Sequence, residues 1–140
     1  MTKARLKQLR EEFLTDTLQY YTTDPKRRCI DVARGQCFYS PENAGKVGIS
    51  EGCAIGRHIT NSLALILDGS MTTAVSSEVV FEQLPLKLRK LQKFFLSDVQ
   101  SLHDRKENWS KNGLTRAGKR NVKTICKNYG LSVDAKYLPK

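Results

Sequence analysis

The chain has 140 residues and a net charge of +10, with 39% apolar and 27% charged residues. This balance is typical of a globular domain and argues against an intrinsically disordered chain. No apolar run approaches the ~20 residues that a membrane helix needs, and the charged N-terminal sequence lacks the apolar core of a secretion signal. We therefore expect a cytoplasmic protein without a membrane anchor.

The first half of the chain predicts one long helix and a small hairpin. Residues 3–22 place apolar side chains at helical spacing, and Asp24 before a proline ends the pattern. Short β-type runs begin at Cys29 and Cys37 on either side of a glycine turn, which predicts two antiparallel strands. After a glycine-rich loop, a second helix is expected from Gly52 to Leu67.

The second half predicts three further helical segments. A short one begins near Glu78, and a long one follows Pro85 and runs over residues 86–104. Thr115 is a favourable cap for the last helix, and Gly130 is a favourable stop. The fold class is therefore α+β and mainly helical, with four to five helices and a hairpin between the first two. We expect one domain over residues 1–132 and a flexible tail over residues 133–140.

The positive charge is concentrated near the end of the sequence. Residues 105–140 carry 10 basic and 2 acidic side chains, whereas residues 37–84 carry 2 basic and 5 acidic ones. One face of the last helix is formed by Arg116, Lys119, Arg120, Lys123 and Lys127. Solvated helices usually intersperse both signs, so this face predicts an anionic partner, either a nucleotide, a nucleic acid or an acidic host protein.

The segment GCAIGRHIT, residues 52–60, is a second candidate for anion binding. A helix that begins at Gly52 would offer unsatisfied backbone N–H groups, which a ligand can approach closely beside glycine. The side chains that would support an anion there are Arg27, Arg28, Arg57 and His58. The alternative is that Gly52 and Gly56 only permit close packing of the helix against the hairpin.

The connection LHDRKENWSKNGL, residues 102–114, gathers side chains suited to a nucleobase. Trp109 or Tyr39 would stack on the base, and His103 with Asn108 would read its edge. The alternative is structural, because a single tryptophan is often a core residue and His103 can cap the preceding helix.

Four cysteines raise the question of disulfides, metal and catalysis. Without an export signal we predict reduced thiols. Cys29, Cys37, Cys53 and His58 are possible zinc ligands, but their spacing matches no common zinc pattern, so we expect no metal and no cofactor.

A cysteine-dependent hydrolase or transferase is the catalytic alternative, with Cys53 or Cys37 as nucleophile and His103 as base. Asp104 directly follows His103, which we expect to prevent its carboxylate from orienting the imidazole. A binding protein is therefore favoured over an enzyme.

Several short motifs follow one another along most of residues 20–130. They are RRC at 27–29, CFY at 37–39, GCAIGR at 52–57, LHD at 102–104, NW at 108–109 and GLT at 113–115. This pattern resembles uncharacterised small proteins encoded by bacteriophages and prophages, although Val99 stands where a leucine is expected. The resemblance implies only a phage setting and carries over no catalytic residue. Small phage proteins often modulate host machinery or host defence by binding, so we expect an accessory protein in the host cytoplasm.

Overall fold

A computed structural model describes residues 1–28, 30–31, 36–40, 52–69 and 74–140, with backbone only at the strand residues 30–31 and 36–37. This part of the chain is mainly helical and contains two short antiparallel hairpins, which confirms the predicted α+β class. The chain divides into two compact units. We call residues 1–26 with 105–140 the terminal unit, and residues 27–104 the central unit.

The terminal unit joins the two ends of the sequence. Its elements are α1 (Lys3–Thr23), η3 (Lys106–Asn108), β3 (Trp109–Ser110), β4 (Gly113–Leu114), α6 (Arg116–Tyr129) and η4 (Ala135–Tyr137). The first helix forms as predicted, with Thr2 accepting a hydrogen bond from the Arg5 N–H over 3.1 Å as its N-cap. Its buried residues recur at helical spacing and are Phe13, Leu14, Thr17, Leu18 and Tyr21.

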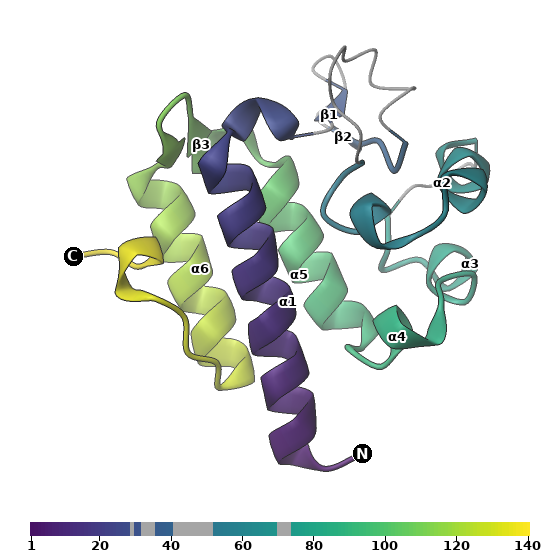
Figure 1. Cartoon of the computed structure of the whole chain (residues 1–140), viewed down its shortest axis with the longest axis horizontal. Coiled ribbons are helices and arrows are strands. Elements are labelled where there is room, and N and C mark those ends of the chain that lie inside the picture. The colour runs from purple at the N-terminus through teal and green to yellow at the C-terminus, as the bar shows by residue number, and fades with distance from the viewer. Residues whose placement is uncertain (29, 32–35, 41–51, 70–73) are drawn as a thin grey trace. The chain divides into compact units, whose positions relative to one another are not determined.

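Helices α1 and α6 run antiparallel and side by side in this unit (Figure 1). Near the start of α1, the Arg10 guanidinium lies 4.9 Å from the centre of the Tyr129 ring at the end of α6. One residue on, a Glu11 carboxylate oxygen accepts a hydrogen bond from the Ser132 N–H over 2.7 Å. Near the C-terminal end of α1, the Thr22 Cβ would lie 3.9 Å from a Cβ on Gly113 of β4. The N-terminus of α6 is therefore brought to the C-terminal end of α1.

Helix α6 begins and ends where the sequence predicts. The Thr115 hydroxyl accepts from the Gly118 N–H over 3.1 Å, and Gly130 closes the helix in the left-handed conformation with a φ of 65°. Gly118 also permits a close approach, because a Cβ there would lie 2.3 Å from the Asn108 carbonyl oxygen. The cap and this contact fix the start of α6 against η3.

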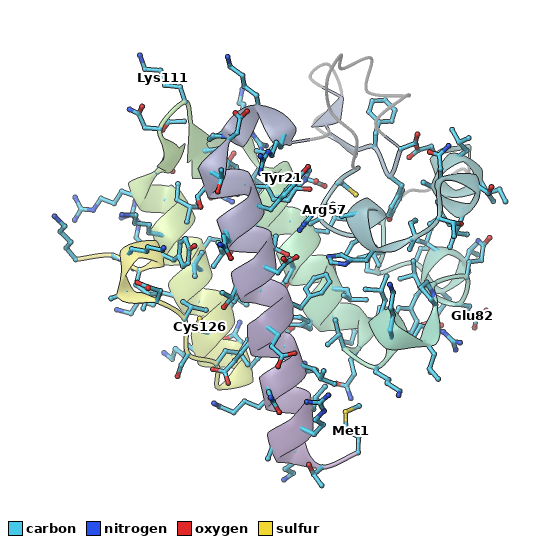
Figure 2. The ribbon with its side chains drawn as sticks, in the orientation of Figure 1. Met1, Tyr21, Arg57, Glu82, Lys111 and Cys126 are labelled. Carbon is cyan, nitrogen blue, oxygen red and sulfur yellow. The ribbon has the colours of Figure 1, made fainter. Side chains whose placement is uncertain are left out.

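The hairpin of β3 and β4 is an element that the sequence analysis missed. Trp109 pairs with Leu114 and Ser110 with Gly113, and Gly113 has a φ of 115° that favours glycine. Lys111 lies in the turn and points away from the fold (Figure 2). Its two-residue strands are too short to show the alternating apolar pattern from which a strand is predicted.

The central unit contains the remaining described elements. They are β1 (Ile30–Asp31), β2 (Gln36–Cys37), η2 (Gly56–His58), α2 (Asn61–Asp68), α3 (Glu78–Phe81), α4 (Leu86–Arg89) and α5 (Lys93–Asp104), with η1 (Pro25–Arg27) at the division between the units. Strands β1 and β2 pair antiparallel, as predicted. The predicted loop over residues 40–52 lies almost wholly outside the described residues.

Two helices of this unit differ from the prediction. No helix begins at Gly52, and α2 begins at Asn61, where the Thr60 hydroxyl accepts from the Leu63 N–H over 3.2 Å. The helix predicted over residues 86–104 is two helices, because Gln92 takes a φ of 75° between α4 and α5. Apolar spacing continues across that break, and spacing alone does not reveal a single residue with a left-handed backbone.

Residues 133–140, where a flexible tail is expected, contain a short helical turn in the structure. Asp134 accepts from the Lys136 N–H over 2.9 Å and opens the short turn η4, in which Tyr137 is 5% exposed. Within the described ranges, no helix is both long and apolar enough to cross a bilayer.

Candidate anion-binding site

Residues 52–58, the predicted anion-binding helix start, form a packing joint in the structure. A Cβ on Gly52 would lie 1.8 Å from the carbonyl oxygen of Tyr39, and a Cβ on Gly56 would lie 2.1 Å from the same oxygen. The only helical element here is the three-residue η2, which is too short for the dipole that the anion hypothesis needed. Gly52 and Gly56 therefore hold backbone against backbone, which favours the packing alternative.

Arg28 and His103 come together at the end of α5. The Arg28 side chain donates to the His103 carbonyl from Nε over 2.7 Å, and to the Asp104 carbonyl from Nη2 over 2.9 Å. These carbonyls belong to the last turn of α5, where they lack partners within the helix. Arg28 is 8% exposed and His103 fully buried, so the arrangement is a buried helix cap.

Asp104 does reach the imidazole that the sequence analysis expected it to miss. The His103 Nδ1 and an Asp104 carboxylate oxygen lie 2.7 Å apart. The His103 side chain of this pair is fully buried. The Asp104 carboxylate therefore orients the imidazole ring, and the ring is not accessible to a ligand.

Tyr39 is buried, and its hydroxyl accepts a hydrogen bond from the Gln100 side-chain amide over 3.1 Å. Burial raises its pKa above the ordinary tyrosine value, more than the Gln100 bond lowers it. The backbone N–H groups of Tyr39 and Ser40 donate to the carboxylate of Asp68 at the end of α2. A base cannot stack on this ring without opening the core.

Asn108 and Trp109 belong to the terminal unit, whereas His103 belongs to the central unit. Trp109 is 7% exposed and meets the Tyr21 ring edge-on, with 6.2 Å between the ring centres. Asn108 is 3% exposed, and its carbonyl accepts from the Thr115 N–H over 2.9 Å. Both residues therefore fill the core, and neither offers a surface for a nucleobase.

Cys53 takes part in a disulfide bond, which corrects the prediction that all four thiols are reduced. Its partner is not Cys126, which is a free cysteine. A disulfide depends on which segments meet in space, and sequence spacing does not report that. A sulfur in a disulfide is neither a zinc ligand nor a nucleophile, which weakens both hypotheses for Cys53. The side chains of Cys29 and Cys37 lie outside the described residues.

Cys126 is the free thiol among the described side chains. Burial first, and then the Glu11 carboxylate, raise the pKa of Cys126 above that of an ordinary thiol, so less thiolate is present at neutral pH. Over the described ranges, no three side chains of the metal-binding types lie close enough to hold an ion.

The basic face of α6 forms as predicted. Arg116, Arg120, Lys123 and Lys127 are exposed, Lys119 is half-buried, and Val122 and Ile125 on the opposite side are buried. No described carboxylate pairs with any of the five cations. The stripe from Arg116 to Lys127 spans about 17 Å along the helix axis at 1.5 Å per residue.

The net positive charge is distributed very unevenly between the two units. The terminal unit carries 15 basic and 6 acidic side chains, a net charge of +9, while the central unit carries 9 and 8, a net charge of +1. The N-terminal helix and the basic C-terminal region are far apart in the sequence but belong to one unit. The electrostatic field that attracts anions therefore originates almost entirely in that unit.

A cavity of about 390 Å³ opens in the terminal unit beside the start of α6. Its walls come from the end of α1, the β3–β4 hairpin, the first turn of α6 and η4. The lining residues are Gln19, Thr22, Thr23, Asn112, Gly113, Leu114, Lys119, Lys136 and Tyr137. A second cavity of about 320 Å³ shares Leu114 and Lys119 with it and adds Arg116 and Lys140.

Of these lining residues, sequence reasoning found only Lys119 and Arg116. Gln19, Asn112 and Lys136 lie in three segments that are far apart in the sequence. No local pattern connects them, because a cavity between elements is made by their packing. The only available signal was the excess of basic residues around them.

Comparison with known proteins gives no further assignment. The chain matches no protein-family model, and no curated protein or solved structure is significantly similar to it. The resemblance to small phage proteins therefore stays a prediction from sequence motifs.

Proposed function

We propose that the protein binds a nucleic acid through the basic face of α6 and acts by binding rather than by catalysis. The observation that carries this proposal is the stripe of five cations on a unit of net charge +9, none of them paired with a described carboxylate. Cations repeated along one axis suit a linear array of phosphates, because each can neutralise a separate phosphate and release its counterions.

The phage setting implied by the sequence motifs extends this proposal. A small basic protein that covers a nucleic acid in the host would act as an accessory factor that modulates host machinery or host defence. An acidic host protein is the competing partner for the same face. Nucleic acid is favoured because its phosphates repeat along one axis, as the cations of α6 do.

The proposal is tested by the salt dependence of binding to a fluorescent oligonucleotide, followed by anisotropy. Each phosphate contact adds about −0.9 to the slope of log K against log salt concentration on double-stranded DNA, so contact by several cations predicts a slope steeper than about −2. The double substitution Arg120→Gln with Lys123→Gln removes two exposed cations from the face, and it should make the slope shallower by about two.

The matched control is Lys87→Gln with Lys90→Gln, which removes the same charge from exposed positions of the central unit. Equal weakening by both pairs would show attraction to net charge alone and would overturn the assignment to α6. Polyglutamate is the comparison ligand. If it binds as tightly as the oligonucleotide at matched charge, the partner is an acidic protein surface.

A further inference from the structure

The larger cavity beside α6 differs chemically from the exposed stripe. Its lining includes two basic residues, Lys119 and Lys136, and none of its lining side chains is acidic. Neither lysine pairs with a described carboxylate. Lys136 lies over the Tyr137 ring, with Nζ 5.1 Å from the ring centre. An anionic group in the cavity would meet two cations and no acidic lining side chain.

The end of α1 supplies hydrogen-bond acceptors to the same cavity. The Thr22 hydroxyl donates to the Leu18 carbonyl over 2.6 Å, and the Thr23 hydroxyl donates to the Gln19 carbonyl over 2.7 Å. Because each hydroxyl proton is used inside the helix, the oxygen lone pairs remain for a ligand that donates. The Gln19 and Asn112 amides can both donate and accept, which suits the mixed edge of a nucleobase or a ribose.

The size of the cavity also limits its ligand. A volume of about 390 Å³ lies at the lower end of the range for small-molecule sites. It suits one nucleotide-sized ligand better than a length of strand. The Thr115 hydroxyl cap fixes the start of α6, and backbone pairing fixes the β3–β4 hairpin, so both parts of the cavity wall are held by hydrogen bonds.

We propose that this cavity binds a single nucleoside monophosphate unit, with its phosphate held by Lys119 and Lys136 and its polar edges held by Gln19, Thr22 and Asn112. The unit has two possible sources, a free nucleotide or the phosphorylated end of a strand. This inference rests on the proposed function for its partner class, because Lys119 belongs to both the cavity and the basic face.

The test is calorimetric titration of the full chain with the four ribonucleoside monophosphates. At least one should bind, and its nucleoside and inorganic phosphate taken separately should bind at least tenfold more weakly. Gln19→Glu adds one negative charge to the cavity wall at almost unchanged size, and it should weaken nucleotide binding about tenfold or more. Gln8→Glu is the matched control, because it adds the same charge at an exposed position of α1 outside the cavity, and it should change binding less than twofold.

Substitutions at two lysines distinguish nucleotide binding in the cavity from strand binding by the basic face. Lys136→Gln should weaken nucleotide binding about tenfold and leave the salt slope for an internal strand almost unchanged. Lys123→Gln, on the exposed stripe, should make the salt slope for an internal strand shallower and leave nucleotide binding almost unchanged. If Lys123→Gln and Lys136→Gln weaken nucleotide binding equally, the ligand is held by diffuse charge and the cavity is not its site. Failure of the strand assay with nucleotide binding intact would overturn only the proposed function.

The source of the nucleotide is decided by comparing a 5′-phosphorylated tetranucleotide with its unphosphorylated form. A phosphate-dependent gain that Gln19→Glu abolishes identifies a strand end. Binding of the monophosphate alone identifies a free nucleotide. No binding of any monophosphate at millimolar concentration, together with equal binding of the two tetranucleotides, would overturn the inference.

Discussion

At Gly52 and Gly56, the absence of a side chain decides how the central unit packs. Both residues press their Cα atoms toward the Tyr39 carbonyl, at distances that leave no room for a methyl group. The Arg28 side chain has a comparable role, because it satisfies two carbonyls at the end of α5. Gly52, Gly56 and Arg28 are candidates for ligand binding in the sequence. In the structure, backbone geometry and hydrogen bonding explain their presence.

We predict that Gly56→Ala lowers the free energy of unfolding by about 2 kcal/mol or more, because backbone atoms would have to move to admit the Cβ. Gly69→Ala is the control at a position with ordinary space, where the nearest atoms to a Cβ lie 3.6 Å away. It should change stability by less than about 0.5 kcal/mol or raise it slightly. Urea unfolding of both variants measures the difference. Equal stabilities would mean that the joint is looser than the structure describes.

At the scale of elements, α6 carries the proposed functions because its ends and faces are well defined. Thr115 holds its start in two ways: its hydroxyl accepts from the Gly118 N–H, and it donates to the Glu107 carbonyl over 2.5 Å. The cap therefore ties the helix to η3 and positions Lys119 in the cavity wall. The same packing buries one face of α6 and leaves its basic face to solvent.

We predict that Thr115→Ala lowers the free energy of unfolding by about 1 to 2 kcal/mol, because it removes the N-cap and leaves a backbone N–H without its partner. Thr124→Ala is the control within the same helix, since the exposed Thr124 hydroxyl bonds only the Arg120 carbonyl one turn earlier. That change should cost less than about 0.5 kcal/mol. Thermal unfolding followed by circular dichroism compares the two, and an equal loss would show that the cap contributes little.

At the scale of the whole molecule, most of the net charge and the disulfide bond belong to different units. The terminal unit holds nearly all of the net charge, whereas Cys53 and its disulfide belong to the central unit. Because Cys126 is free, the four cysteines allow at most one disulfide. Such a bond stabilises a fold mainly by restricting the unfolded chain, and it persists in oxidising surroundings.

We predict that a thiol assay on the denatured, unreduced protein finds two free thiols, and that reduction lowers the free energy of unfolding by about 2 to 4 kcal/mol. Cys53→Ser should abolish the effect of the reductant. Cys126→Ser should leave that effect intact and reduce the free-thiol count to one. Four free thiols in the native chain would contradict the disulfide.

The sequence alone predicted what depends on local patterns. Apolar spacing gave α1 and α6, the cap and stop residues gave the ends of α6, and the one-sided cations gave its basic face. It could not predict the break at Gln92 or the β3–β4 hairpin, and it left open whether His103 and Trp109 bind a ligand or belong to the core. Each of these depends on one backbone angle or on neighbours far away in the sequence.

Only the tertiary structure decided that residues 52–60 contain a packing joint and that a cavity opens at the start of α6. Local composition made residues 52–60 resemble a ligand site, but the Tyr39 carbonyl fills the space beside its glycines. The cavity at the start of α6 had no local pattern, because Gln19, Asn112 and Lys136 meet only after the two ends of the chain pack together. Charge and helical period are properties of neighbouring residues, whereas a cavity is a property of packed elements.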